Sequence, residues 1–161
     1  MIKHFKYLKY VLRHKWFVFW YGVWTGVSIW RCLTHDMSKL LPREWFPYVN
    51  YFYGNGMTRE DGANEDINSK WLLDFEVAWN HHQKRNDHHW QYWIRQGDDG
   101  TRLVLQMPEQ AMLEMLADWR GAGRALGKPD TQAWYKMNAH KMTLHPDTRS
   151  LVEELLGLSV A

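Results

Sequence analysis

Histidines are concentrated in one short stretch, residues 79–93, where four of the nine histidines of the chain lie within nine residues. Imidazoles gathered in this way suit the binding of a transition metal through neutral ring nitrogens. On one continuous helix, residues seven apart lie on nearly the same face, so His82 and His89 would share a face. His81 and His88 would share the neighbouring face. A polar, partly buried helix whose histidines bond to backbone and water is the alternative, but the density of histidines favours metal.

Further candidate ligands lie outside this stretch. Asp118 stands among apolar positions of a helical pattern, where an unpaired carboxylate would be costly, so it needs a partner or a metal. Imidazoles combined with two carboxylates suit one or two divalent ions of Mn, Fe, Co, Ni or Zn, and disfavour an all-oxygen Mg or Ca cage. Which of the paired histidines in residues 81–82 and 88–89 bind metal stays open. The predicted metal ligands are His14, His35, Asp36, His82, His89 and Asp118.

Two residues beside His35 are predicted to be catalytic, Asp36 and Lys39. Asp36 could bridge two metals or orient a metal-bound water. Lys39 follows three residues later on the same helical side and could meet a phosphate as a point charge, or be a solvated surface lysine. Lys39, Arg85 and His88 are the predicted substrate-binding residues. No serine or cysteine stands in a recognisable activated setting, which favours attack by water.

The length of 161 residues and the 45% hydrophobic content predict one domain, residues 1–161, with a sizeable core. Long helical periodicity with almost no alternating runs predicts the all-α class. The uncharged run 16–30 is shorter than the about 20 residues that a membrane span needs, so it is expected to be a central buried helix. A loop is predicted at 54–69 and an extended piece at 102–106. Helices are predicted over 2–34, 44–52, 69–94, 107–120, 131–141 and 146–156.

Charge and cysteine content limit the partners and the compartment. The chain has 20 basic and 18 acidic residues, a balance that does not predict binding to polymeric nucleic acid. Cys32 is the only cysteine, so a disulfide framework is excluded and a reduced setting is expected. We expect a cytoplasmic protein, in the host cytoplasm if it is phage-encoded. The expected partner is a small phosphorylated metabolite or nucleotide, with no membrane contact; the oligomeric state is not predicted.

The order of the candidate ligands, His, His-Asp, His, His and Asp, resembles that of the HD-domain superfamily of metal-dependent phosphohydrolases. Residues 35–39, His-Asp-Met-Ser-Lys, look like the His-Asp-x-x-Lys variant of its phosphodiesterase branch. This resemblance implies an HD-domain-like helical bundle with the metal site between helices.

A closer resemblance is to an uncharacterised family of small phage and bacterial proteins. Its motifs are matched by His14-Lys15, by residues 35–39, by His82 with residues 86–89 (Asn-Asp-His-His), and by residues 114–119 (Glu-Met-Leu-Ala-Asp-Trp). The match runs in order over residues 14–155. This family carries no settled activity, so the resemblance does not name a substrate.

Ligands and resemblance together predict a metal-dependent phosphohydrolase that uses metal-activated water. A small phosphorylated substrate is expected, with a nucleotide or a nucleotide second messenger as the leading candidate. Two alternatives stay open. A di-iron oxygenase could use the same ligand set, and a non-enzymatic phage protein could bind a host factor through an HD-like core.

Overall fold

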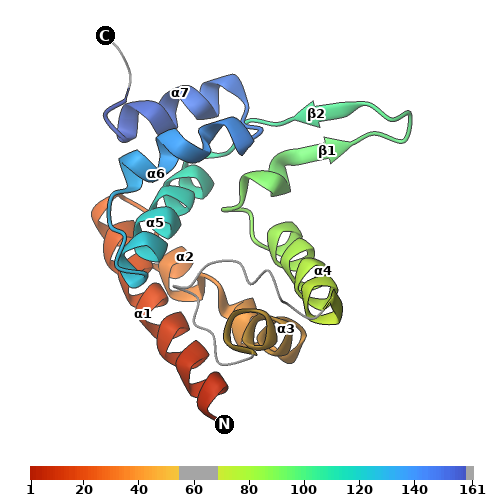
Figure 1. Ribbon diagram of the computed structural model, residues 1–161. Coiled ribbons are helices and arrows are strands. Elements are labelled where there is room, and N and C mark those ends of the chain that lie inside the picture. The colour runs from red at the N-terminus through yellow and green to blue at the C-terminus, as the bar shows by residue number, and fades with distance from the viewer. Residues whose placement is uncertain (55–68, 159–161) are drawn as a thin grey trace.

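The computed structural model describes residues 1–54 and 69–158 (Figure 1). The all-α class is confirmed, with one small hairpin as the exception among the described residues. The 3₁₀ turns are Met37–Leu40, Trp90–Trp93 and Ala139–Lys141, and the strands are β1 (Ile94–Gln96) and β2 (Arg102–Val104). The helices are α1 (Ile2–Trp24), α2 (Ile29–Thr34), α3 (Pro42–Tyr53), α4 (Ser69–Arg85), α5 (Glu109–Ala125), α6 (Thr131–Asn138) and α7 (Pro146–Leu155).

Local sequence signals set where several helices begin. Ser28 Oγ accepts a hydrogen bond from Arg31 N at the start of α2, and Asp130 Oδ1 accepts one from Ala133 N at the start of α6. Pro42 and Pro146 stand in the first turns of α3 and α7, where a missing N–H costs nothing.

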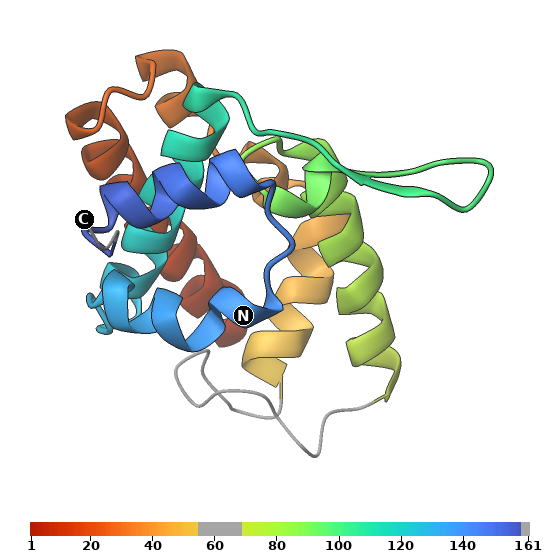
Figure 2. The ribbon, with the colours of Figure 1, turned by 90° about the horizontal axis from the view of Figure 1, so that it is seen from above.

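Helix α1 packs along α5, while α3 packs along α4 on another side of the molecule. Figure 2 shows the β1–β2 hairpin projecting away from the helices. One apolar cluster joins α1, α3 and α4 around Tyr7, Val11 and Tyr48. A second cluster joins α5, α6 and α7, with Leu116 and Val152 among its members. The helices that these clusters hold together supply the side chains of the candidate site.

Gly121 sets the close approach of α1 and α5. A Cβ at this position would lie 2.5 Å from Val18 Cγ2 and 2.9 Å from Val18 N, so a methyl group forces the helices apart. Gly121→Ala is therefore expected to lower the free energy of unfolding by about 1–3 kcal/mol, measured by urea denaturation. In a double-mutant cycle, the costs of Gly121→Ala and Val18→Ala should be less than additive. An unchanged urea midpoint for Gly121→Ala would contradict this packing.

The run 16–30 is not the buried central helix that the sequence predicts. Gly26 adopts a left-handed φ of +88° and breaks the helical path between α1 and α2. Val18 and Val27 are buried, but Trp16 is 64% exposed and Trp24 and Trp30 are each 77% exposed. The prediction fails because α1 has only one inward face, and Trp16 and Trp24 fall outside it. Within the described ranges, every helix is too short or too polar to span a membrane.

The predicted helix 69–94 is wrong beyond Arg85, where α4 ends. Asn86 donates to the carbonyl oxygen of His82 through both its backbone N, at 3.1 Å, and its side-chain Nδ2, at 2.8 Å, which satisfies this carbonyl at the end of α4. Asp87 pairs with Arg31 instead. Residues 94–96 then form β1 and pair with β2, so the extended prediction is confirmed over 102–104. The loop predicted at 54–69 lies almost wholly outside the described residues.

Candidate metal centre

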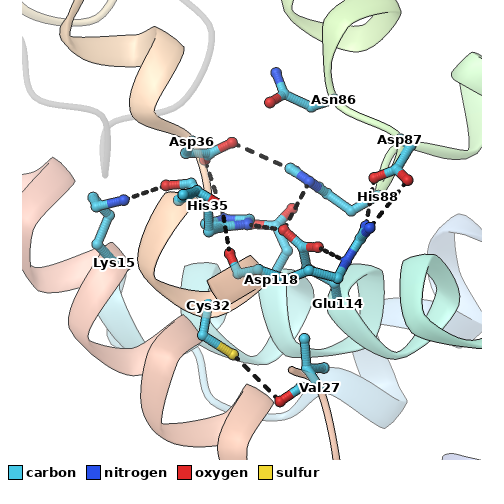
Figure 3. A network of polar contacts seen from close by, with 12 residues as sticks. Lys15, Val27, Cys32, His35, Asp36, Asn86, Asp87, His88, Glu114 and Asp118 are labelled. Atoms are coloured by element: carbon cyan, nitrogen blue, oxygen red, sulfur yellow. Dashed lines mark hydrogen bonds and ion pairs between the residues drawn. The ribbon is translucent and has the colours of Figure 1, made fainter. Parts of the chain in front are cut away.

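Asp36 lies at the centre of the candidate site. It is fully buried between α2 and the turn Met37–Leu40, and its backbone is left-handed, with φ +55°. Aspartate is among the few non-glycine residues that adopt this conformation readily. Left-handed non-glycine residues cluster at functional sites, because the surrounding structure must impose them. Here the sharp change of direction brings the carboxylate between the preceding His35 and His88, which follows α4 (Figure 3).

A first ligand set joins α1, the end of α2 and α5. His14 Nε2 lies 3.2 Å from Asp36 Oδ2 and 3.1 Å from Asp118 Oδ1. His35 Nε2 lies 3.3 Å and 3.5 Å from the same two oxygens, and 3.4 Å from His14 Nε2. Ligands at 2.0–2.1 Å from a tetrahedral metal are separated by about 3.3–3.4 Å. The five separations therefore match the edges of a tetrahedral metal site.

A second ligand set is made by Asp36, His82, His88 and His89, with one ligand atom from each within 4.8 Å of the others. Asp36 Oδ1 lies 3.1 Å from His82 Nε2 and 3.4 Å from His88 Nε2. These three atoms and His89 Nε2 are buried without a hydrogen-bond partner among the described residues. Buried polar atoms without partners cost free energy, and a metal bound by all four atoms would remove that cost.

Two further carboxylates contact the imidazoles at their Nδ1 atoms. Glu114 Oε1 lies 2.9 Å from His35 Nδ1 and 3.2 Å from His88 Nδ1 (Figure 3). Glu44 Oε2 lies 2.8 Å from His82 Nδ1 and accepts a hydrogen bond from Ser38 Oγ at 2.9 Å. A carboxylate that accepts the Nδ1 proton fixes the tautomer and leaves Nε2 free to bind metal. This arrangement is the usual support of histidine metal ligands.

The charge balance of the buried residues also favours a cation. The carboxylates of Asp36, Glu44, Glu114 and Asp118 are buried, against one buried ammonium group, that of Lys39. The guanidinium of partly buried Arg31 pairs with Glu114, so four negative charges against two positive charges leave two negative charges when the imidazoles are neutral. Uncompensated buried charge is costly, so the pocket must take up protons or cations.

The pKa values show how these charges are compensated without metal. Burial alone would lower the pKa of His35, but Asp36, Asp118 and Glu114 raise it well above its ordinary value. Burial alone would raise the pKa of Glu114, but hydrogen bonds with His35 and His88 lower it to about 2. A protonated His35 thus offsets part of the negative charge in the metal-free protein. Burial, together with His88 and His82, lowers the pKa of His89 well below its usual value, and the neutral ring suits metal binding.

A protein family described as a family of unknown function (DUF5662) matches residues 3–158. The chain belongs to this family. The prediction of an uncharacterised family is thereby confirmed, and the match includes every residue of both ligand sets. The searches of curated proteins and of solved structures found no match. The resemblance of this DUF5662 chain to HD-domain enzymes stays a prediction.

The structure brings all six predicted metal ligands together. Asp36 is shared between the two ligand sets, and the remaining five divide between them. His88, predicted to bind substrate, lies in the second ligand set, so its geometry favours a ligand role. His81 belongs to neither set, and its Nδ1 lies 2.9 Å from Glu44 Oε1.

The other predicted residues lie around the ligand sets. Lys39 is buried and bonds to Asp36 Oδ2. Burial alone would lower the pKa of Lys39, but the carboxylates of Asp36 and Asp118 raise it above its ordinary value. Arg85 is exposed at a cavity of about 320 Å³ that His35 and His88 also line.

The supporting residues were missed by the sequence reasoning. Glu114 Oε2 accepts a hydrogen bond from Arg31 Nε at 2.7 Å, and Arg31 also pairs with Asp87, so this ion-pair chain ties α2, α5 and the end of α4 together. Glu114 had a detectable signal, because it stands four residues before Asp118 and shares its helix face. Glu44 had none, since its contact with His82 spans 38 residues.

Proposed function

We propose that this protein is a metal-dependent phosphohydrolase with an HD-like helical bundle, acting on a small phosphorylated substrate such as a nucleotide or nucleotide second messenger. The observation that carries the proposal is the first ligand set, whose ligand-to-ligand distances of 3.1–3.5 Å fit a tetrahedral divalent metal. Asp36 places one oxygen beside each ligand set, as a carboxylate that bridges two metals would.

Divalent metals at this place would lower the pKa of a bound water and stabilise negative charge on a phosphoryl oxygen. Lys39 would add a fixed positive charge. Its side chain lines a cavity of about 140 Å³ together with His14, His89 and Asp118, one or more residues from each ligand set. Because its pKa is raised, the ammonium group stays charged at neutral pH and can bind a phosphoryl oxygen.

The nearby hydroxyl and thiol groups are not activated as nucleophiles, which favours attack by water. Ser38 Oγ donates its hydrogen bond to Glu44 and lies 3.1 Å from His82 Nδ1. Glu44 also contacts that His82 atom. Cys32 is buried, and burial together with the charge of Glu114 raises the pKa of its thiol. A thiol with a raised pKa is a poor nucleophile. We therefore propose direct hydrolysis without a covalent enzyme intermediate.

A nucleotide is favoured by the cavity that reaches the second ligand set from another side. This cavity, of about 290 Å³, is lined by His89 and Asp118 and by the tryptophans Trp79, Trp90, Trp119 and Trp134. Gln91 also lines it, and its Oε1 is buried without a hydrogen-bond partner among the described residues. Indole rings stack on planar bases, and an amide oxygen can accept a hydrogen bond from a base edge.

Trp134 gives a test of this ring-binding cavity. Its ring centroid lies 5.3 Å from that of Trp119, and it is partly exposed, so its replacement should leave the fold intact. Trp134→Ala is expected to raise KM for a nucleotide by about tenfold, because stacking on an aromatic side chain contributes roughly 1–3 kcal/mol per base. The KM for a ring-free phosphomonoester such as glycerol phosphate should not change. Equal effects on both substrates would contradict a ring-binding role.

The activity test is a screen of nucleoside mono-, di- and triphosphates and cyclic dinucleotides with Mn, Fe, Co, Ni and Zn in turn. Lys39→Ala should lower kcat by about 10²-fold, the usual cost of losing one charge-stabilising donor, while the bound metal stays. Lys84→Ala is the control, since Lys84 is exposed and bonds only to the Gln91 carbonyl oxygen in the hydrogen bonds described.

Three outcomes distinguish the functions. Phosphate or nucleotide release that needs Lys39 supports the phosphohydrolase. Iron-dependent oxygen consumption would replace it with an oxygenase. No turnover with any metal, together with unchanged binding of a host protein after Asp36 is replaced, would leave a binding module.

A further inference from the structure

Helix α1 carries an apolar face that no other described element covers. Phe5, Leu12, Trp16, Trp20 and Trp24 follow one another at helical spacings of four or seven, so they lie on one side of the helix. All five are exposed, Phe5 to 70%. The opposite side packs inward through Tyr7, Val11, His14, Val18 and Gly22. Figure 1 shows α1 along one edge of the molecule.

This side of α1, defined by the five exposed residues Phe5, Leu12, Trp16, Trp20 and Trp24, is the α1 apolar face. Single exposed apolar residues are normal on a protein surface, but a continuous row along a 23-residue helix is a mark of a binding surface. Three of the five are tryptophans, whose amphipathic rings favour the boundary between lipid and water.

The charged residues around this face are all basic. The first 35 residues contain no aspartate or glutamate and six basic residues, namely Lys3, Lys6, Lys9, Arg13, Lys15 and Arg31. Lys6 and Lys9 are exposed. Lys9 falls within the apolar row, four residues after Phe5 and three before Leu12, and Lys6 falls at its border. The nearest acidic residue in the sequence, Asp36, is fully buried and offers no compensation at the surface.

We propose that the α1 apolar face binds the surface of an anionic lipid bilayer, with α1 lying in the plane of the interface. Apolar and aromatic side chains on one face with lysines beside them are the arrangement of interfacial helices. The lysines would meet anionic headgroups while the tryptophans enter the boundary region. The proposal is independent of the metal centre. It replaces the expectation of no membrane contact, which rested on burial of the run 16–30.

A second copy of the chain fits this face less well. In a symmetric pair through α1, Lys6 and Lys9 of one copy would approach the same basic helix of the other. Neither copy has an acidic residue in α1 or α2 to pair with them. Like charges brought together across an interface oppose binding, whereas an anionic surface complements them.

The test is co-sedimentation of the full chain with vesicles of phosphatidylcholine and phosphatidylglycerol at three to one, against vesicles of phosphatidylcholine alone. The anionic vesicles should bind the protein at least about tenfold more tightly, and added salt should weaken binding. The double variant Trp16→Gln/Trp24→Gln should lose binding. Leu73→Gln/Val77→Gln, which changes exposed apolar residues of α4, is the matched control and should bind as the wild type does.

A charge variant separates the two contributions. Lys6→Glu/Lys9→Glu keeps the apolar row and should weaken binding to anionic vesicles by at least about tenfold, since each basic residue near such a surface contributes several-fold. Circular dichroism checks that each variant is folded. Failure of the wild type to sediment with anionic vesicles overturns the proposal, as does equal loss in the α4 control. A dimer in sedimentation equilibrium that Trp16→Gln/Trp24→Gln dissociates would assign the face to a second copy instead.

Discussion

Replacing Asp36 with asparagine is expected to remove bound metal and to abolish hydrolysis together. Both ligand sets include Asp36, so its charge serves a metal bound in either of them. Asparagine has nearly the same shape and tolerates the left-handed φ of +55° at this position, so the backbone path should persist. Metal content by elemental analysis should fall to background. The rate should fall by at least about 10³-fold, because water loses the activation that a metal provides.

Glu114→Gln is the matched control for Asp36→Asn. Glu114 supports His35 and His88 through their Nδ1 atoms and stands outside the two ligand sets. Loss of such a supporting carboxylate costs about 10–100-fold in metal affinity, so this variant should recover metal and activity when excess metal is supplied. Asp36→Asn should not recover. If Asp36→Asn retains its metal while Glu114→Gln loses it, the centre of the site is misassigned.

Removal of metal is expected to lower the melting temperature by about 10 °C. A ligand at a thousand times its Kd stabilises the folded state by about 4 kcal/mol, and a chain of this size gains roughly 2–4 °C per kcal/mol. The charge excess described above gives the physical reason, since four buried carboxylates face only the ammonium group of Lys39 and the guanidinium group of Arg31 among the described residues. The measurement is calorimetry of the protein with excess metal and after exhaustive dialysis against chelator.

Asp36→Asn again serves as the reference, because its melting temperature should be insensitive to chelator. Equal melting temperatures of the wild-type protein with each of Mn, Fe, Co, Ni and Zn and without metal would contradict a metal centre in the core.

The sequence predicted the helical class and much of the helix pattern, because apolar spacing reports directly on an inward face. Met112, Met115 and Leu116 follow this spacing along α5 and are buried. It did not predict the end of α4, which depends on contacts distant in sequence. Asp87 leaves the helix to pair with Arg31, 56 residues earlier in the chain. The β1–β2 hairpin can form only because α4 ends before it.

The tryptophan-rich run was misjudged for a different reason. Composition suggested burial, whereas position on the helix decides it. Trp16 and Trp24 lie on the side of α1 away from α5, and their apolar character therefore indicates a surface role.

The residues of the candidate site were predicted better than the backbone path that brings them together. His82 and His89 were placed in one site by the geometry of a continuous helix, yet His89 lies after the helix has ended. The chemistry of the residue types gave the candidate ligands, since histidines and aspartates at this density favour metal binding. The supporting carboxylates were not assigned, because a glutamate such as Glu44 has no mark in the sequence that separates it from a surface residue.

Anomalous diffraction from crystals grown with Mn or Zn tests the central claim most directly. We predict a peak at the metal edge within about 2.0–2.3 Å of one ligand atom each from His14, His35, Asp36 and Asp118, the four residues of the first ligand set. A second peak on the other side of Asp36, beside His82, would show a two-metal centre. Absence of any peak within bonding distance of Asp36, in crystals soaked to saturation with these metals, would contradict the account.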